Sequence, residues 1–507
     1  MYKVSCSSYC RFIDTAKYRI IVRMDKKLFL NYIYSILYQL VRVILPVITV
    51  PFLQATIGAA TIGISDFAGN ISSWFILFGV LGVNVYGNRQ IAKVRNNKEN
   101  LSRTFFEILF MQFANMVIVS VFYALYILVA VRENALIYWI FFINILASAI
   151  DISWFYYGVE DFKIASIRNT LVRICSVGLL LLFIKSPEDL VIYTVIITGT
   201  ELLGSLAMFS RLKKYITRVP FSLKDAYRNH FRGTVALFIP TIAINVYTLL
   251  DQSMLGFIGG NMQSLNLYKT AQSFVKMFLQ FITSIGAVML PRVTNVFYND
   301  EGGREKAIGY IGTTFKIACA LSIPMVLAMV FVSPTFFPWY LRRSPNVVPE
   351  MIRLVQISSP ILFFIALSNV FGTQFLVPTG RTKEYTTSVI SGAVVNFFLN
   401  LFLIPKFLGY GAAIASCIAE LTVTLVQYNF VRKDLKLSVD RSILIYLLAG
   451  ALMSAYVFLI GNVMGARILT NVVQAGGGVL VYALTLILLK EGLFTGLLGK
   501  LLRRNNG

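Results

Sequence analysis

Charged residues are scarce in this chain. They make up 14% of its 507 residues, whereas 57% are hydrophobic. A water-soluble domain has about 25% charged and about 45–50% apolar residues. A single soluble core cannot enclose so much apolar surface, but a lipid bilayer accepts it when helices satisfy the backbone polar groups internally. The composition therefore excludes an ordinary soluble protein and predicts an all-α polytopic membrane protein.

Residues and motifs that serve soluble enzymes are also few. The chain has one histidine and five cysteines, and it lacks a phosphate-binding P-loop, an HExxH motif and a CxxC pair. The histidine, His230, lies in a basic stretch and is expected to be a solvated loop residue. The sequence therefore predicts a protein that is not an enzyme, with no metal and no cofactor.

Long apolar runs dominate the chain. A crossing needs about 20 mostly apolar residues, and by this measure the sequence predicts about fourteen transmembrane helices. We expect an N-terminal cytoplasmic extension (1–27), a six-helix N-lobe (28–215), a cytoplasmic inter-lobe linker (216–233), a six-helix C-lobe (234–436), and two additional helices with a cytoplasmic tail (437–507).

Basic residues indicate the orientation. The net charge is +23, and Lys and Arg lie mainly in alternate loops between the apolar runs. The positive-inside rule then places both termini and the basic stretch 211–232 in the cytoplasm, as in a multi-pass plasma-membrane protein. Arg342 and Arg343 are exceptions, in the longest expected outer loop, roughly 334–353. Because this pattern explains the basic charge, no nucleic-acid partner is expected.

The chain also contains an internal repeat. Residues 163–184 and 383–404 both begin with Lys after a short basic loop and end with Ile. The next apolar run of each half carries one acid, Glu201 or Glu420. Six helices per half is an even number, so both halves enter the membrane from the same side. This predicts a parallel repeat with the transport site between the lobes.

Several basic residues fall inside the apolar runs, where charge is costly and usually functional. Lys269 and Lys276 are two helical turns apart and share one face. A cavity lined by Arg42, Lys269, Lys276 and Arg173 would suit a phosphate-bearing substrate, because these side chains form charge-assisted hydrogen bonds with phosphate oxygens. Alternatively, these basic residues snorkel to an interface or pair with acids: Glu107, Asp151, Glu201 or Asp251.

Acids inside the apolar runs are candidates for ion coupling: Asp251, Glu201 and Glu420. Asp251 follows an apolar run in a proline-containing segment. A carboxylate there could bind a coupling cation or a proton. It could equally cap a helix end or pair with Lys269, and the sequence leaves these alternatives open.

Several segments resemble a known family. They are TVPFLQATIGAATIGISDFAGN (49–70), GVLGVNVYGNRQIAKVR (79–95), SWFYYGVEDFKIASIRN (153–169), LLDQSMLG (249–256), LYKTAQSFVK (267–276), MLPRV (289–293), FLVPTGRTKEY (375–385) and GAAIASCIAE (411–420). In this order they are similar to segments of the O-antigen and capsule polysaccharide flippases. This family is a branch of the MOP superfamily, which also includes multidrug MATE exporters and lipid II flippases.

The resemblance implies a V-shaped transporter with a central cationic cavity and alternating access. It implies that undecaprenyl-diphosphate-linked oligosaccharide is moved from the inner to the outer leaflet for polysaccharide biosynthesis. Membrane lipid, and association with polysaccharide polymerase and chain-length proteins, are the further partners that it implies.

Two other functions are considered. A multidrug or cation antiporter of the same fold would need acids in its cavity, whereas basic residues prevail here. A membrane polymerase or glycosyltransferase usually has a large outer loop or a soluble catalytic domain, and the sequence predicts only short loops.

Overall fold

The computed structural model describes residues 41, 44–299, 302–435 and 440–496. Within these ranges the chain is helical and contains no strand. Among these described residues, ten helical segments are long and apolar enough to cross a membrane. They are Ala59–Val94, Lys98–Ala130, Ala135–Gly158, Phe162–Phe183, Pro187–Lys214, Gly303–Tyr340, Pro345–Leu376, Thr382–Leu435, Arg441–Met464 and Ile468–Leu488.

Several of these segments are composite. The first contains α3 (Ala59–Val80) and α4 (Val83–Val94), which are separated by a left-handed turn at Leu81 and Gly82. The eighth is α16 (Thr382–Leu435), in which Leu408 has φ 50° and joins two successive helices. The expected count of about fourteen also includes the helix Ile44–Thr56, α11 (Arg232–Met254) and α12 (Met262–Asn299), which are not among the ten.

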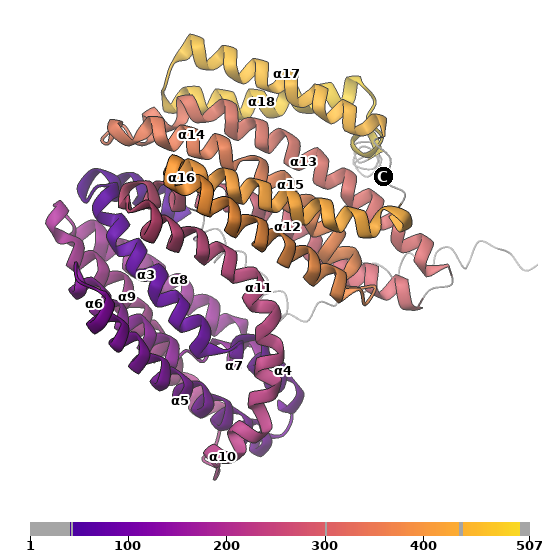
Figure 1. The fold of residues 1–507 in the computed structure, drawn as a ribbon. Helices are drawn as coiled ribbons and strands as arrows, with labels where there is room; N and C mark the ends of the chain where they lie inside the picture. Colours follow the sequence, from indigo (N-terminus) through magenta and orange to yellow (C-terminus); the bar gives the residue numbers. More distant parts are fainter. Residues whose placement is uncertain (1–40, 42–43, 300–301, 436–439, 497–507) are drawn as a thin grey trace, which may run out of the picture.

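The helices form two bundles that converge at one end and spread apart at the other, in a V (Figure 1). The N-lobe contains α3 to α9: α5 (Lys98–Ala130), α6 (Ala135–Ala149), α7 (Ser153–Gly158), α8 (Phe162–Phe183) and α9 (Leu190–Met208), with α3 and α4. The C-lobe contains α11 to α16, including α13 (Gly303–Tyr340), α14 (Val348–Ser358) and α15 (Pro360–Ser368). The final pair, α17 (Arg441–Met464) and α18 (Ile468–Leu488), packs against α13.

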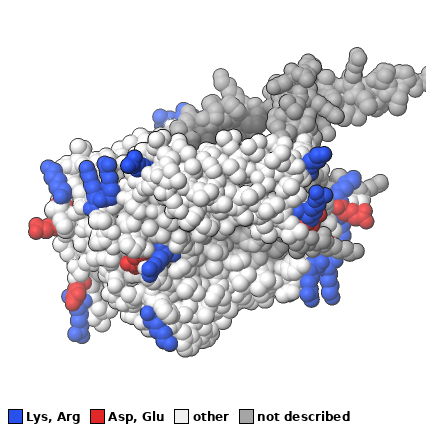
Figure 2. Space-filling view, turned by 90° about the horizontal axis from the view of Figure 1, so that it is seen from above, with Lys and Arg blue, Asp and Glu red and all other residues white. Residues whose placement is uncertain are grey.

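Charge is unevenly distributed on the surface. In Figure 2, Lys and Arg lie mainly toward the two ends of the visible face, and a broad surface without charged residues lies between them. Large apolar side chains are exposed on the lipid-facing helices, for example Leu128 at 71% and Val479 at 67%. This distribution is that of a multi-pass membrane protein.

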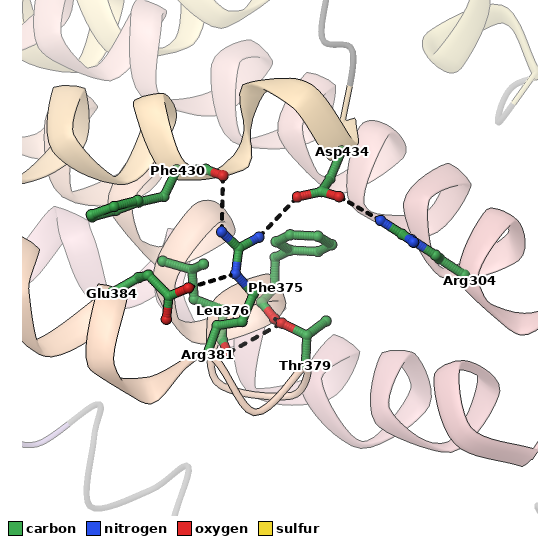
Figure 3. Close-up of polar contacts among 8 residues, drawn as sticks. All are labelled: Arg304, Phe375, Leu376, Thr379, Arg381, Glu384, Phe430 and Asp434. Carbon is green, nitrogen blue, oxygen red and sulfur yellow. Dashed lines mark hydrogen bonds and ion pairs between the residues drawn. The ribbon is translucent and has the colours of Figure 1, made fainter.

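The two lobes repeat one local turn, 220 residues apart. Glu160 (φ 58°) and Gly380 (φ 76°) both adopt the left-handed conformation. The following residues close the turn in the same way: the amide of Asp161 donates to Tyr156 O at 2.9 Å, and that of Arg381 to Leu376 O at 2.8 Å. The side chains of Asp161 and Arg381 each contact the region where the sixth helix of their own lobe ends. Tyr215 donates to Asp161, and Arg381 donates to Asp434 (Figure 3). These parallels support the expected duplication.

Two expectations are wrong. The segment 334–353 is not an extended loop, because α13 continues to Tyr340 and α14 begins at Val348. His230 is not solvated: it is 7% exposed. Its Nε2 lies 2.8 Å from a Glu107 carboxylate oxygen and its Nδ1 lies 2.9 Å from the Tyr86 hydroxyl. It therefore joins the segment that precedes α11 to α4 and α5 of the N-lobe.

Candidate functional site

A cavity of about 450 Å³ lies between the lobes. Its walls come from the helix Ile44–Thr56, α3, α8 and α9 on one side and from α12 on the other. Three of the four basic residues expected at a phosphate site line it: Arg173, Lys269 and Lys276. Arg42 lies outside the described residues. The cavity therefore collects positive charge from both lobes at one place.

The basic residues reach this cavity from different helices. Arg173 comes from the middle of α8, and Lys269 and Lys276 come from one face of α12. The Lys269 side chain is 43% exposed although it forms an ion pair. Hydrogen-bond donors from both lobes can bind the same anionic group. Binding of that group would then depend on the relative position of the lobes.

Lys269 pairs with an acid that was not expected. Its ammonium lies 2.5 Å from one carboxylate oxygen of Asp66, which is 8% exposed on α3. The other oxygen accepts a hydrogen bond from the Asn266 amide at 2.7 Å, and Asn266 accepts one from Gln54 at 2.6 Å. The alternative in which Lys269 pairs with Asp251 is therefore wrong. Instead, Asp66 links α3 of the N-lobe to α12 of the C-lobe.

The sequence contains a signal for Asp66. It lies inside an apolar run, in the segment GISDFAGN, seven residues after the first residue of α3, just as Lys269 lies seven residues after the first residue of α12. Because Asp66 and Lys269 lie equally far from the start of their helices, the sequence places both side chains at a similar depth in the membrane, where they could form an ion pair. Asn266 and Gln54 are uncharged and give no comparable signal.

Asp251 lies in a second, smaller pocket of about 40 Å³ inside the C-lobe. It is 2% exposed and accepts three hydrogen bonds: from the Tyr268 hydroxyl at 2.6 Å, Asn400 at 2.6 Å and Ser416 at 2.5 Å. These three partners are neutral. The structure therefore excludes Asp251 as a solvated helix end.

The two other acids expected in ion coupling lie in different places. Glu420 lines the same small pocket as Asp251. Glu201 lies in the N-lobe, where it pairs with Arg168 at 3.2 Å and lines neither cavity. Lys276 lines both the small pocket and the inter-lobe cavity, so it lies between the acids of the C-lobe and the cationic cavity.

An apolar groove of about 450 Å³ continues from the cationic cavity. The two share Val47, Phe274 and Met277 as lining residues. The groove runs along α13 to α17 and α18, and almost all its lining side chains are apolar. A molecule with a charged head and a long hydrocarbon chain would match this succession of surfaces.

Comparison with known proteins agrees with this architecture. The chain matches the family described as "Polysaccharide biosynthesis protein" over residues 28–297. It is 26% identical over 413 residues to the protein of Escherichia coli strain K12 named "Putative O-antigen transporter", covering 80% of this chain and 96% of the relative. A shorter match, 24% identical over 311 residues, is to the protein of the same name from Shigella dysenteriae, covering 60% of this chain and 75% of that protein.

Solved structures show the same fold. Lipid II flippase MurJ in its inward closed conformation has a TM-score of 0.64 and 17% identity, and the match covers 91% of this chain and 99% of that one. An inward-facing multidrug resistance MATE family transporter of the MOP superfamily has a TM-score of 0.56 and 13% identity, with 78% and 98% covered. The helical fold is thus that of MurJ and MATE proteins, and the named relatives are transporters rather than enzymes. The chain belongs to the polysaccharide biosynthesis protein family.

Proposed function

We propose that this protein moves undecaprenyl-diphosphate-linked oligosaccharide repeat units from the inner to the outer leaflet of the plasma membrane, by alternating access. One observation carries the proposal: Arg173 of one lobe and Lys269 and Lys276 of the other line one inter-lobe cavity. A diphosphate cannot cross the hydrocarbon layer without replacement of its lost hydration. These side chains offer charge-assisted hydrogen bonds in its place.

The apolar groove supports the lipid part of the substrate. It begins at the cavity wall and extends toward α18, where Val479 is 67% exposed. The prenyl chain leaves the cavity along this groove and stays in apolar surroundings, while the diphosphate and sugars occupy the cavity. The two final helices would therefore serve the lipid chain.

The pocket around Asp251 supports ion coupling. We assign Asp251 and Glu420 as the groups that hold a coupling proton or Na⁺, because carboxylate, amide and hydroxyl oxygens are ligands that hard cations accept. Tyr268, which donates to Asp251, directly precedes Lys269 in α12. Binding of a proton or Na⁺ at Asp251 would thereby alter the contacts of α12, the helix that carries Lys269 and Lys276.

The competing functions have less support. A multidrug or cation antiporter needs acids facing its substrate, but the described cavity lining has three basic residues and one acid, Asp66, which is already paired. An oligosaccharide polymerase or glycosyltransferase needs a catalytic group, and the cavity lining offers donors that bind an anion instead.

The proposal is tested by transport in proteoliposomes that contain a lipid-linked oligosaccharide. We expect Arg173→Ala, Lys269→Ala and Lys276→Ala each to reduce translocation at least about tenfold, equivalent to ~1.4 kcal/mol, while the protein remains inserted and folded. Lys185→Ala is the matched control, since Lys185 is exposed and lines neither cavity. Normal translocation by all three cavity variants would contradict the proposal.

A further inference from the structure

The only acid in the described lining of the inter-lobe cavity holds one of its basic residues. Both carboxylate oxygens of Asp66 bind α12, one through Lys269 and one through Asn266. An ammonium beside a carboxylate attracts a second anion weakly, because the field of the pair largely cancels at a distance. Lys269 therefore binds a substrate anion strongly only when Asp66 has moved away.

The same contact holds the lobes together. One turn before Asp66, α3 touches the backbone of α12: a Cβ at Gly63 would lie 1.9 Å from Met262 O and 2.9 Å from Met262 Cβ. The backbones can approach this closely only because residue 63 is glycine. The Asp66 ion pair thus lies directly beside the closed contact, at the end where α3 and α12 both begin.

We propose that Asp66 is an internal substitute for the substrate anion, and that a diphosphate entering the cavity displaces it from Lys269 and so releases α3 from α12. This inference rests on the proposed function and deepens it. A ligand shifts a conformational equilibrium only through its different affinity for the two states. Here the difference is supplied by Lys269, which is shared with Asp66 in the closed state and available to the diphosphate in the released state.

The displacement links the entry of substrate on one side to the opening of the protein on the other. With the inter-lobe linker in the cytoplasm, the ends of α3 and α12 that meet at Gly63 face the outside. Substrate entering from the cytoplasm therefore weakens the seal on the opposite side. A neighbouring contact between the lobes is neutral: Ser253 donates to Asn70 at 2.6 Å and Trp74 donates to Ser253 at 2.8 Å. An anion does not compete for these neutral hydrogen bonds, so substrate binding acts on the Asp66–Lys269 ion pair.

Binding is the first test, with the full chain in nanodiscs and undecaprenyl diphosphate as the probe. We expect Asp66→Asn to bind the probe about fivefold more tightly or better than the parent protein, the lower end of common coupling between sites. Asp440→Asn is the control, because Asp440 pairs with Lys316 away from the cavity. Equal or weaker binding by Asp66→Asn would overturn the displacement.

Distance between the lobes is the second test. Spin labels at Ala60 and Gln263, which line one depression at the closed end, are introduced into a chain without its five cysteines. In the parent we expect a short distance that lengthens when the probe is added. Asp66→Asn should show the longer distance without probe, and so should Gly63→Val, which separates the helices without changing charge. A short distance that persists in both variants would refute the inference.

The same measurements separate this inference from the proposed function. Lys269→Ala that binds the probe as well as the parent would overturn the displacement. If Arg173→Ala and Lys276→Ala also bind it as well as the parent, the proposed function is overturned too, because no diphosphate then depends on the cavity. Lys269→Ala that loses binding, while Asp66→Asn shows neither tighter binding nor a longer distance, would leave the proposed function intact and overturn the displacement alone.

Discussion

At the scale of single residues, buried acids in this protein differ in the kind of partner they have. Asp66 has a cationic partner, Lys269, whereas Tyr268, Asn400 and Ser416, which donate to Asp251, are neutral. An acid with a cationic partner forms an ion pair, which a competing anion can displace. An acid among neutral oxygens and amides is suited to exchange a proton or a cation.

Replacing Asp251 tests its role in coupling. Asp251→Asn keeps the shape of the side chain, and the two hydroxyls and the Asn400 amide can reorient to pair with it. We expect the variant to lose stimulation by a pH or Na⁺ gradient, yet to exchange substrate passively in proteoliposomes. Ser416→Ala, which removes one hydrogen bond to Asp251, should weaken the stimulation only in part. A gradient response equal to that of the parent in Asp251→Asn would remove this acid from the mechanism.

The sequence predicts that Lys269 and Lys276 line one cavity, as they do, but it does not predict the partner of Lys269. Lys269 and Lys276 were identifiable because charge inside an apolar run is costly and a helical spacing of seven places both on one face. Asp66 was overlooked, and His230 was misassigned, because their partners lie 203 and 123 residues away in the chain. Such pairing depends on how helices pack, which local periodicity does not encode.

At the scale of elements, Arg381 ties together the ends of the C-lobe helices (Figure 3). It donates to Glu384 at 3.0 Å, to Asp434 at 2.8 Å and to Phe430 O at 3.0 Å, so one guanidinium joins both ends of α16. Asp434 also binds Arg304 near the start of α13. The planar fork of a guanidinium suits three acceptors in different directions, and an ammonium does not reproduce it.

The three hydrogen bonds of Arg381 should contribute measurably to the free energy of unfolding. Arg381→Lys leaves at least one acceptor without its partner, and we expect it to lower the free energy of unfolding by about 1–2 kcal/mol. Arg304→Lys is the comparison, because the Arg304 side chain is 66% exposed, and exposed pairs contribute about 0–1 kcal/mol. Unfolding in detergent, followed by tryptophan fluorescence, measures both. Equal losses in the two variants would mean that Arg381 acts as an ordinary surface charge.

At the scale of the whole molecule, hydropathy predicted the helical membrane fold. It did not predict which helices would meet at the inter-lobe cavity. The cavity is lined by the helix Ile44–Thr56, α3, α8, α9 and α12, which come from distant parts of the chain. Such an arrangement depends on how the helices pack, which hydropathy along the chain does not encode.

The orientation of the molecule can be measured directly. We expect Lys224→Cys, exposed in the inter-lobe linker, to react with a membrane-impermeant maleimide only after the cells are permeabilised. Glu133→Cys, exposed between α5 and α6, should react in intact cells. Both changes belong in a chain without its native cysteines. Labelling of Lys224→Cys in sealed cells would reverse the proposed topology and the direction of transport that depends on it.

The polar character of α12 also constrains how the protein is made. During synthesis each helix partitions from the insertion channel into lipid, and a lysine near the middle of a span opposes this by about 2.5–3.5 kcal/mol. Helix α12 carries Lys269 and Lys276. Asp66, the partner of Lys269, is translated 203 residues earlier. An N-lobe already resident in the bilayer can therefore receive α12 as it emerges. Biogenesis would then proceed lobe by lobe, with the first lobe acting as an assembly template for the second.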